Sequence, residues 1–163
     1  MTLPAIQQEL DKIEDLFRTA GRVQKTSELP LSLALAAAGH LTQYICVRVA
    51  GLMEHAVRQI FFAYALSKVG ASPLASFVSN SLERPGNLGP EPLCQLVGQF
   101  DSEWDSELRD YMEGERWDAL GSVIRNRNKI SHGDTVSLGF VQMKEWYDRV
   151  VEIINYIERQ VIP

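Results

Sequence analysis

Cysteine is scarce in this sequence, whose 163 residues include only Cys46 and Cys94. The two thiols lie far apart, and neither belongs to a CxxC pair or a ligand-like cluster, so we expect no zinc site and no redox-active dithiol. Proline and glycine are also few, at 7 and 11 residues, and the hydrophobic content is 45%. These proportions exclude collagen-like order and intrinsic disorder.

A basic excess is missing as well, because 16 basic residues stand against 21 acidic ones and the formal net charge is −5. This balance argues against a general nucleic-acid coat protein. The negative charge is concentrated, however, since residues 101–118 carry eight acids and two bases, a local net of −6. The rest of the chain therefore sums to +1, and the net charge says little about any single face.

The sequence also lacks a recognisable signal peptide and a clear membrane span. Residues 1–17 are amphipathic rather than basic and then apolar, and the longest uncharged run, residues 29–47, is interrupted by polar side chains, Pro30 and Gly39. A chain of this length can bury a stable core without a metal or a disulfide. We expect no cofactor. We therefore expect one domain over residues 1–163, cytoplasmic and without a membrane partner.

Apolar residues recur with the period of an α-helix along most of the chain, and strand-like alternation is absent. Thr2 and Pro4 predict the start of a first helix, whose apolar stripe runs from Ile6 to Ala20. Gly21 and the later Pro30 predict its end. A long apolar helix is predicted from residue 31 or 41 to 69, and the last helix over residues 140–161. Shorter helices are predicted over 73–82 (with Ser72 as N-cap), 92–100, 101–113 and 117–130, with a Pro/Gly loop at 84–90. The pattern predicts an all-α bundle with two long helices and several short ones.

One segment, residues 124–133, concentrates reactive side chains at the predicted end of a helix. It has three bases without an acid, then histidine and glycine: Arg125, Arg127, Lys129, His132 and Gly133. Imidazole titrates near neutrality, and a guanidinium can donate two hydrogen bonds to a phosphate. Asn128 lies four residues before His132, so its amide can orient the ring from the same helical face. This set suits phosphodiester chemistry without a metal.

The sequence Arg127-Asn128-Lys129-Ile130-Ser131-His132, with glycine next, has the form Arg-Asn-x-x-x-His. In a helical chain with one helix remaining, it resembles the signature of HEPN domains (higher eukaryotes and prokaryotes nucleotide-binding). Those domains are all-α bundles of four to six helices, with the motif near one end of the penultimate helix. Residues 140–161 correspond to the final helix, and the long apolar helix that carries Glu54 corresponds to the second.

The resemblance implies a metal-independent endoribonuclease of the kind found in bacterial toxin–antitoxin and defence systems. In such an enzyme the ribose 2′-OH attacks the adjacent phosphate and leaves a cyclic 2′,3′-phosphate and a 5′-OH. His132 would be the acid/base group, Arg127 the phosphate clamp, and Asn128 would hold the motif geometry. The implied partners are an RNA substrate and an antitoxin or other regulatory protein.

The spacing within the motif favours a dimer. Arg127 and His132 are five residues apart, which places them about 140° out of phase on a regular helix. Two motifs that face each other across a dimer axis bring such groups together more easily than one chain does, and the resemblance implies the same composite site. We therefore expect a homodimer with the motif helices at its cleft.

A simpler interpretation also fits, because bases and histidine are favoured at any helix C-terminus and glycine often follows as a cap. Arg125, Lys129 and Ser131 are expected to contact RNA, although Arg125 and Lys129 suit an ordinary surface equally well.

Glu54 is expected to pair with Arg127 and fix its rotamer, with an i,i+4 pair to Arg58 as the alternative. Two other functions stay open besides the nuclease. One is a non-catalytic HEPN module that binds RNA, a nucleotide or a protein partner. The other is a helical adaptor in which the motif only caps a helix.

Overall fold

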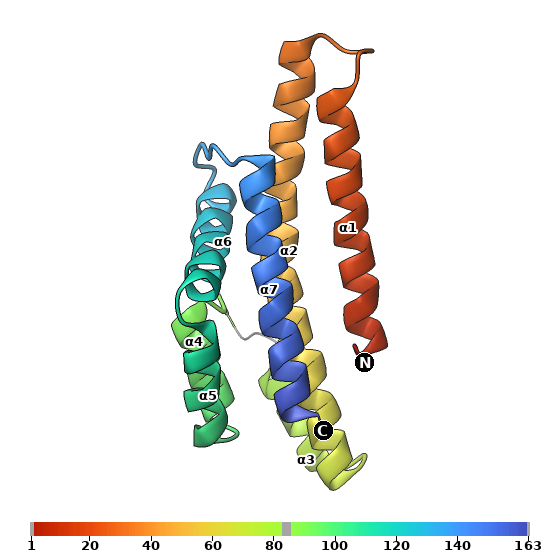
Figure 1. Cartoon of the computed structure of the whole chain (residues 1–163). Coiled ribbons are helices and arrows are strands. Elements are labelled where there is room, and N and C mark those ends of the chain that lie inside the picture. Colours follow the sequence, from red (N-terminus) through yellow and green to blue (C-terminus); the bar gives the residue numbers. More distant parts are fainter. Residues whose placement is uncertain (1, 83–85, 163) are drawn as a thin grey trace.

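The computed structural model describes residues 2–82 and 86–162, and in these ranges the chain forms seven α-helices and no strand (Figure 1). The helices are α1 (Pro4–Lys25), α2 (Leu31–Val69), α3 (Pro73–Ser81), α4 (Pro90–Gly98), α5 (Ser102–Met112), α6 (Glu115–Ser131) and α7 (Phe140–Val161). Helices α1, α2 and α7 run side by side, and α4, α5 and α6 cover one flank of them (Figure 1). The predicted all-α bundle is confirmed.

Helix α1 begins at Pro4, whose fixed φ and missing N–H suit a first helical position. Its N-cap is Leu3 rather than Thr2, and the Leu3 side chain makes no capping hydrogen bond. Instead, the Leu3 backbone N–H donates to Glu158 Oε1 of α7 at 2.6 Å, and Glu158 is only 7% exposed. The helix continues through Gly21 to Lys25, beyond Ala20, the last buried residue of its apolar stripe, because a single glycine weakens a helix without ending it.

Helix α2 is the central element, with 39 residues that start at Leu31, the earlier of the two predicted positions. It packs against α1, α3, α6 and α7. Ile45, Met53 and Ile60 along its length have no exposed surface. In the described ranges α2 is the one helix long and apolar enough to cross a membrane, a test that the core helix of a bundle also passes. In its most apolar stretch, 39% of the residues are buried inside the bundle.

The short helices have the starts that local chemistry favours. The Ser72 side chain accepts a hydrogen bond from Ala75 N at 3.4 Å, which confirms the predicted cap of α3. Asp101, predicted as the first residue of its helix, is instead the N-cap of α5 and accepts from Glu103 N at 2.8 Å. Helix α4 starts two residues earlier than predicted because Pro90 occupies its first position. Part of the predicted Pro/Gly loop, residues 84 and 85, lies outside the described residues.

Helices α6 and α7 bring the motif onto the core. Helix α7 has the predicted bounds, and α6 extends the prediction by two residues at its start and one at its end. Helix α6 packs on both α2 and α7, and its Leu120 and Val123 are fully buried. The motif therefore stands on a helix that packs against both the central helix and the last one.

The contact between Leu3 and Glu158 generates a stability prediction. We expect Glu158→Ala to lower the free energy of unfolding by about 1–2 kcal/mol, because it removes a hydrogen bond to a charged group and leaves the Leu3 N–H unpaired. Urea unfolding followed by circular dichroism measures the change. Glu145→Ala, which removes an exposed carboxylate of the same helix, is the control, and equal stability of the two variants would contradict a role for the contact.

Candidate functional site

The motif ends α6 with a glycine cap. Gly133 has φ +81°, a left-handed conformation that glycine adopts without strain. Its N–H donates to the Ile130 carbonyl at 3.1 Å, and the Asp134 N–H donates to the Lys129 carbonyl at 3.0 Å. This pair of bonds is a Schellman motif, so the capping interpretation of Gly133 is confirmed. Capping uses only backbone groups here and leaves the neighbouring side chains available.

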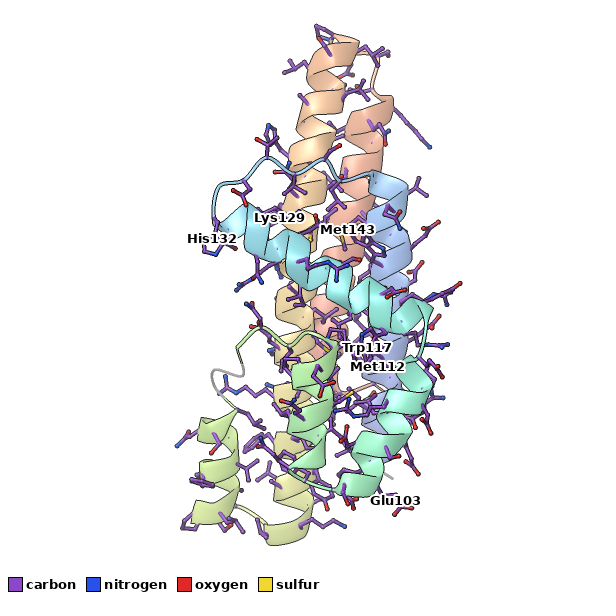
Figure 2. All side chains as sticks on the ribbon, turned by 90° about the vertical axis from the view of Figure 1, so that its left-hand side faces the viewer. Glu103, Met112, Trp117, Lys129, His132 and Met143 are labelled. Atoms are coloured by element: carbon purple, nitrogen blue, oxygen red, sulfur yellow. The ribbon has the colours of Figure 1, made fainter. Side chains whose placement is uncertain are left out.

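His132 occupies the C-cap position and is exposed. Its backbone N–H donates to the Asn128 carbonyl at 3.0 Å, whereas its ring makes no hydrogen bond within residues 2–82 and 86–162. Figure 2 shows the side chain at the outer end of α6, pointing away from the bundle. The ring is therefore reachable for a substrate.

The backbone around the motif is tied to α2. The Cys46 thiol donates to the Val123 carbonyl at 3.5 Å, and Gln43 Nε2 donates to the Val136 carbonyl at 2.9 Å. The first bond lies one helical turn before Arg127, and the second lies in the connection that follows His132. The motif is thus fixed to the central helix on both sides.

Arg127 is held by two amide oxygens. Its Nη1 donates to Asn87 Oδ1 at 2.9 Å and to Asn128 Oδ1 at 3.1 Å. Asn87 belongs to the connection before α4 and is 40 residues away in the sequence. No periodicity, cap or motif in the sequence identifies this residue, because the contact depends on how the chain returns to α6.

Asn128 contacts Arg127 rather than His132. Its side-chain oxygen is turned toward the Arg127 guanidinium, and no hydrogen bond joins the Asn128 amide to the His132 ring in the part of the chain that the structure describes. The expectation that the Asn128 amide orients the His132 ring is therefore wrong, because this amide orients the Arg127 guanidinium instead. This arrangement still agrees with a role for Asn128 in holding the motif geometry.

Glu54 lies half-buried on α2, within the electrostatic influence of Arg127. Burial raises the pKa of its carboxyl above the ordinary value, and the positive charge of Arg127 opposes that rise. The expected pairing of Glu54 with Arg127, and its alternative with Arg58, stay predictions.

The motif side chains separate onto two sides of α6. Arg125, Lys129 and His132 follow one another at i, i+4 and i+7, so they share one helical face, and all three are exposed. Arg125 Nη2 also donates to Ser122 Oγ at 2.9 Å. Arg127 is half-buried and turned toward Asn87. One copy of the chain therefore presents the guanidinium and the imidazole in different directions, and Ser131, the last residue of α6, is exposed beside them.

Charge changes sign along the flank formed by α5 and α6. Lys129 and His132 lie at one end of this face and Glu103 at the other (Figure 2). At the acidic end Arg109 pairs with Glu91 at 2.7 Å and with Asp105 at 2.7 Å, so part of the acidity is neutralised locally. The basic end carries Arg125, Arg127 and Lys129 without an acid between them.

Other reactive groups are arranged less favourably for catalysis. In residues 2–82 and 86–162 no group of three His, Cys, Asp or Glu side chains could hold a metal ion. Both cysteines are buried, and burial raises the pKa of the Cys46 and Cys94 thiols to about 11. At neutral pH both are thiols rather than nucleophilic thiolates.

Comparison with curated proteins gave no match, and comparison with solved structures gave none either. The family described as RiboL-PSP-HEPN matches residues 5–162, which includes every helix from the second residue of α1 onward. This match agrees with the helical architecture and with the position of the Arg-Asn-x-x-x-His motif before the last helix. The chain therefore belongs to the RiboL-PSP-HEPN family of HEPN domains.

Proposed function

We propose that the protein is a metal-independent endoribonuclease in which Arg127 binds the scissile phosphate and His132 transfers protons. The observation that carries this proposal is the contrast between the two side chains. Arg127 is held by Asn87 and Asn128, whereas the His132 ring is open at the outer end of α6. A fixed guanidinium suits stabilisation of developing charge, because preorganised donors need not reorient during the reaction. A reachable imidazole suits general acid–base catalysis.

In the proposed reaction the ribose 2′-OH attacks the adjacent phosphorus while the bond to the 5′-oxygen breaks. An imidazole accepts the 2′-OH proton, and a protonated imidazole donates a proton to the leaving 5′-oxygen. The products are a cyclic 2′,3′-phosphate and a 5′-OH, and no water is consumed. Arg127 stays protonated throughout and offers two donors to the phosphoryl oxygens.

A homodimer supplies what one copy lacks. One imidazole cannot accept and donate a proton in the same step, and Arg127 and His132 lie on different sides of α6. Two α6 helices that face each other across a two-fold axis provide a second His132 and bring the guanidinium of one copy toward the imidazole of the other. We therefore place the reaction at a composite site between two copies.

The exposed residues around His132 are proposed to bind the RNA backbone. Arg125 and Lys129 offer charge, and Ser131 offers a hydroxyl, so all three suit phosphate contacts that position RNA without reading its sequence. The acidic flank opposes non-specific binding, which depends on phosphate neutralisation. By analogy with the family, we also propose that the enzyme acts in the cytoplasm as a toxin or defence effector restrained by an antitoxin or other regulatory protein.

The central prediction concerns cleavage of RNA in the presence of EDTA. We expect the wild-type protein to cleave total RNA into fragments with cyclic 2′,3′-phosphate ends, and Arg127→Ala and His132→Ala each to reduce the rate about 100-fold or more, because each removes a group used in the transition state. Gel analysis with end-group labelling measures both results. Arg159→Ala, which removes an exposed cation of α7, is the matched control.

Three outcomes would contradict this assignment. Loss of cleavage on chelation would rule out a metal-independent mechanism, and full activity in either motif variant would rule out its assigned role. A wild-type protein that retains several classes of RNA in a shift assay without cleaving them would favour the non-catalytic binding module.

Asn87 generates a second prediction, as a positioning residue for Arg127. We expect Asn87→Ala to lower kcat about 10-fold with little change in KM, because the guanidinium loses an acceptor that holds it in the productive orientation. Asn87→Asp keeps an acceptor oxygen and should recover most of the rate. Asn80→Ala, at an exposed asparagine of α3, is the control, and a change in KM alone would contradict positioning.

The composite site generates a third prediction. Each chain has a mass of 18.3 kDa, so sedimentation at micromolar protein should show a species of about 37 kDa. Mixing an excess of His132→Ala chains with the wild type should lower the activity of the wild type, because a mixed dimer keeps only one of the two imidazoles that the reaction uses. A monomer in sedimentation, or wild-type activity that the added variant leaves unchanged, would contradict the shared site.

A further inference from the structure

A groove separates the end of α1 from the start of α7, away from the motif helix. It has a volume of about 780 Å³ and is lined by Phe17, Arg18, Gly21, Arg22, Gln24, Lys25, Thr26, Phe140 and Val141. The rings of Phe17 and Phe140 meet edge to face at 5.7 Å and form an apolar floor. Val141 at its edge is 70% exposed. The groove thus offers apolar surface that nothing in the described residues covers.

The rim of this groove carries charge of one sign. Arg18, Arg22 and Lys25 are exposed cations one turn apart on α1, and no acid is among the lining residues. Arg18 makes only a long, exposed contact of 3.8 Å with Asp15. For Arg22 and Lys25, the structure of residues 2–82 and 86–162 gives no ion pair or side-chain hydrogen bond. In a chain of net charge −5, this is a local positive patch around an apolar centre.

The same end of the molecule exposes further aliphatic surface. The α1–α2 hairpin projects beyond the start of α7 (Figure 1). At its tip Leu31 is 71% exposed and Leu33 is 53% exposed. Large apolar side chains that are grouped and exposed mark sites of association.

We propose that this groove, lined by α1 and α7, binds an acidic amphipathic segment of a partner protein. A large aliphatic or aromatic side chain of that segment would pack against Phe140 and Val141, over the buried Phe17 ring. Its flanking Asp or Glu residues would pair with Arg18, Arg22 and Lys25 at the rim. Charge complementarity selects the partner, and the apolar floor fixes its register.

Two other occupants fit the groove less well. RNA bases stack on exposed aromatic faces, but Phe17 is only 4% exposed, Val141 is aliphatic, and Phe140 is half-buried against the Phe17 ring. A bilayer surface could contact the hairpin tip. A bilayer is broad, however, and could not fill a concave groove beside the helix ends. A protein side chain matches both the shape and the chemistry. The inference does not depend on the proposed nuclease activity.

A peptide selection tests the proposal on the intact protein. A displayed library of 16-residue peptides is selected against the wild type, and the enriched peptides are measured by fluorescence anisotropy. We expect enriched sequences with two or more acids around a large apolar residue. Their binding should weaken at least 10-fold in the double variant Arg22→Glu/Lys25→Glu and in Val141→Asp, and should also weaken as salt is raised.

Matched variants elsewhere on the surface separate the groove from general effects. Arg159→Glu reverses an exposed cation of α7, and Leu74→Asp changes an apolar side chain of α3 that is 56% exposed. Both should bind the selected peptides as the wild type does. Thermal unfolding of all variants confirms that each one folds.

Three results would overturn the proposal. The first is enrichment of neutral or basic peptides, or no enrichment over the Val141→Asp protein. The second is that the wild type binds vesicles of phosphatidylglycerol and phosphatidylcholine in a flotation assay, whereas the double variant loses this binding and still binds the peptides. That result would assign the surface to a membrane. The third is that the selection enriches no peptide and the double variant no longer retains RNA. That result would assign the surface to RNA.

Discussion

Burial of α2 is the interaction on which the rest of the structure depends. Its buried side chains face α1, α6 and α7 at once, so removing any of these helices would expose part of the same apolar surface. Helix α2 also reaches the motif through Cys46 and Gln43, whose bonds to Val123 and Val136 lie before and after it. The motif at the end of α6 therefore takes its place from the core and not from contacts among its own side chains.

The last turn of α6 both caps the helix and presents the motif side chains, two roles that at first look like alternatives. A helix C-terminus needs its carbonyls satisfied, and Gly133 and Asp134 do this with backbone N–H groups alone. The side chains before them take no part in the cap, with Arg127 turned toward Asn87 and His132 turned away from the bundle. The structural and the catalytic interpretations of the motif therefore describe the same residues, one through the backbone and the other through the side chains.

Much of the fold could be predicted from the sequence, because helical periodicity and capping residues are local signals. The bounds of α7 and the cap at Ser72 were predicted on this basis and are confirmed. The start of α1 could not be predicted fully, since it uses a carboxylate from the far end of the chain. The motif residues were found from their spacing, whereas Asn87 was not, because its contact with Arg127 arises only from tertiary packing. The turn of Asn128 toward Arg127 likewise depends on a rotamer that spacing does not determine.

The bond between Leu3 and Glu158 joins residues 155 positions apart, and it has a consequence for synthesis of the chain. The motif is complete once His132 has been added, but the core closes only after residues 140–161 have followed. At about 5–20 residues per second, there is an interval in which α6 lacks its packing partner α7. On the proposed function, the growing chain is therefore inactive beside the messenger RNA that encodes it, and cleavage begins only after the last helix has docked.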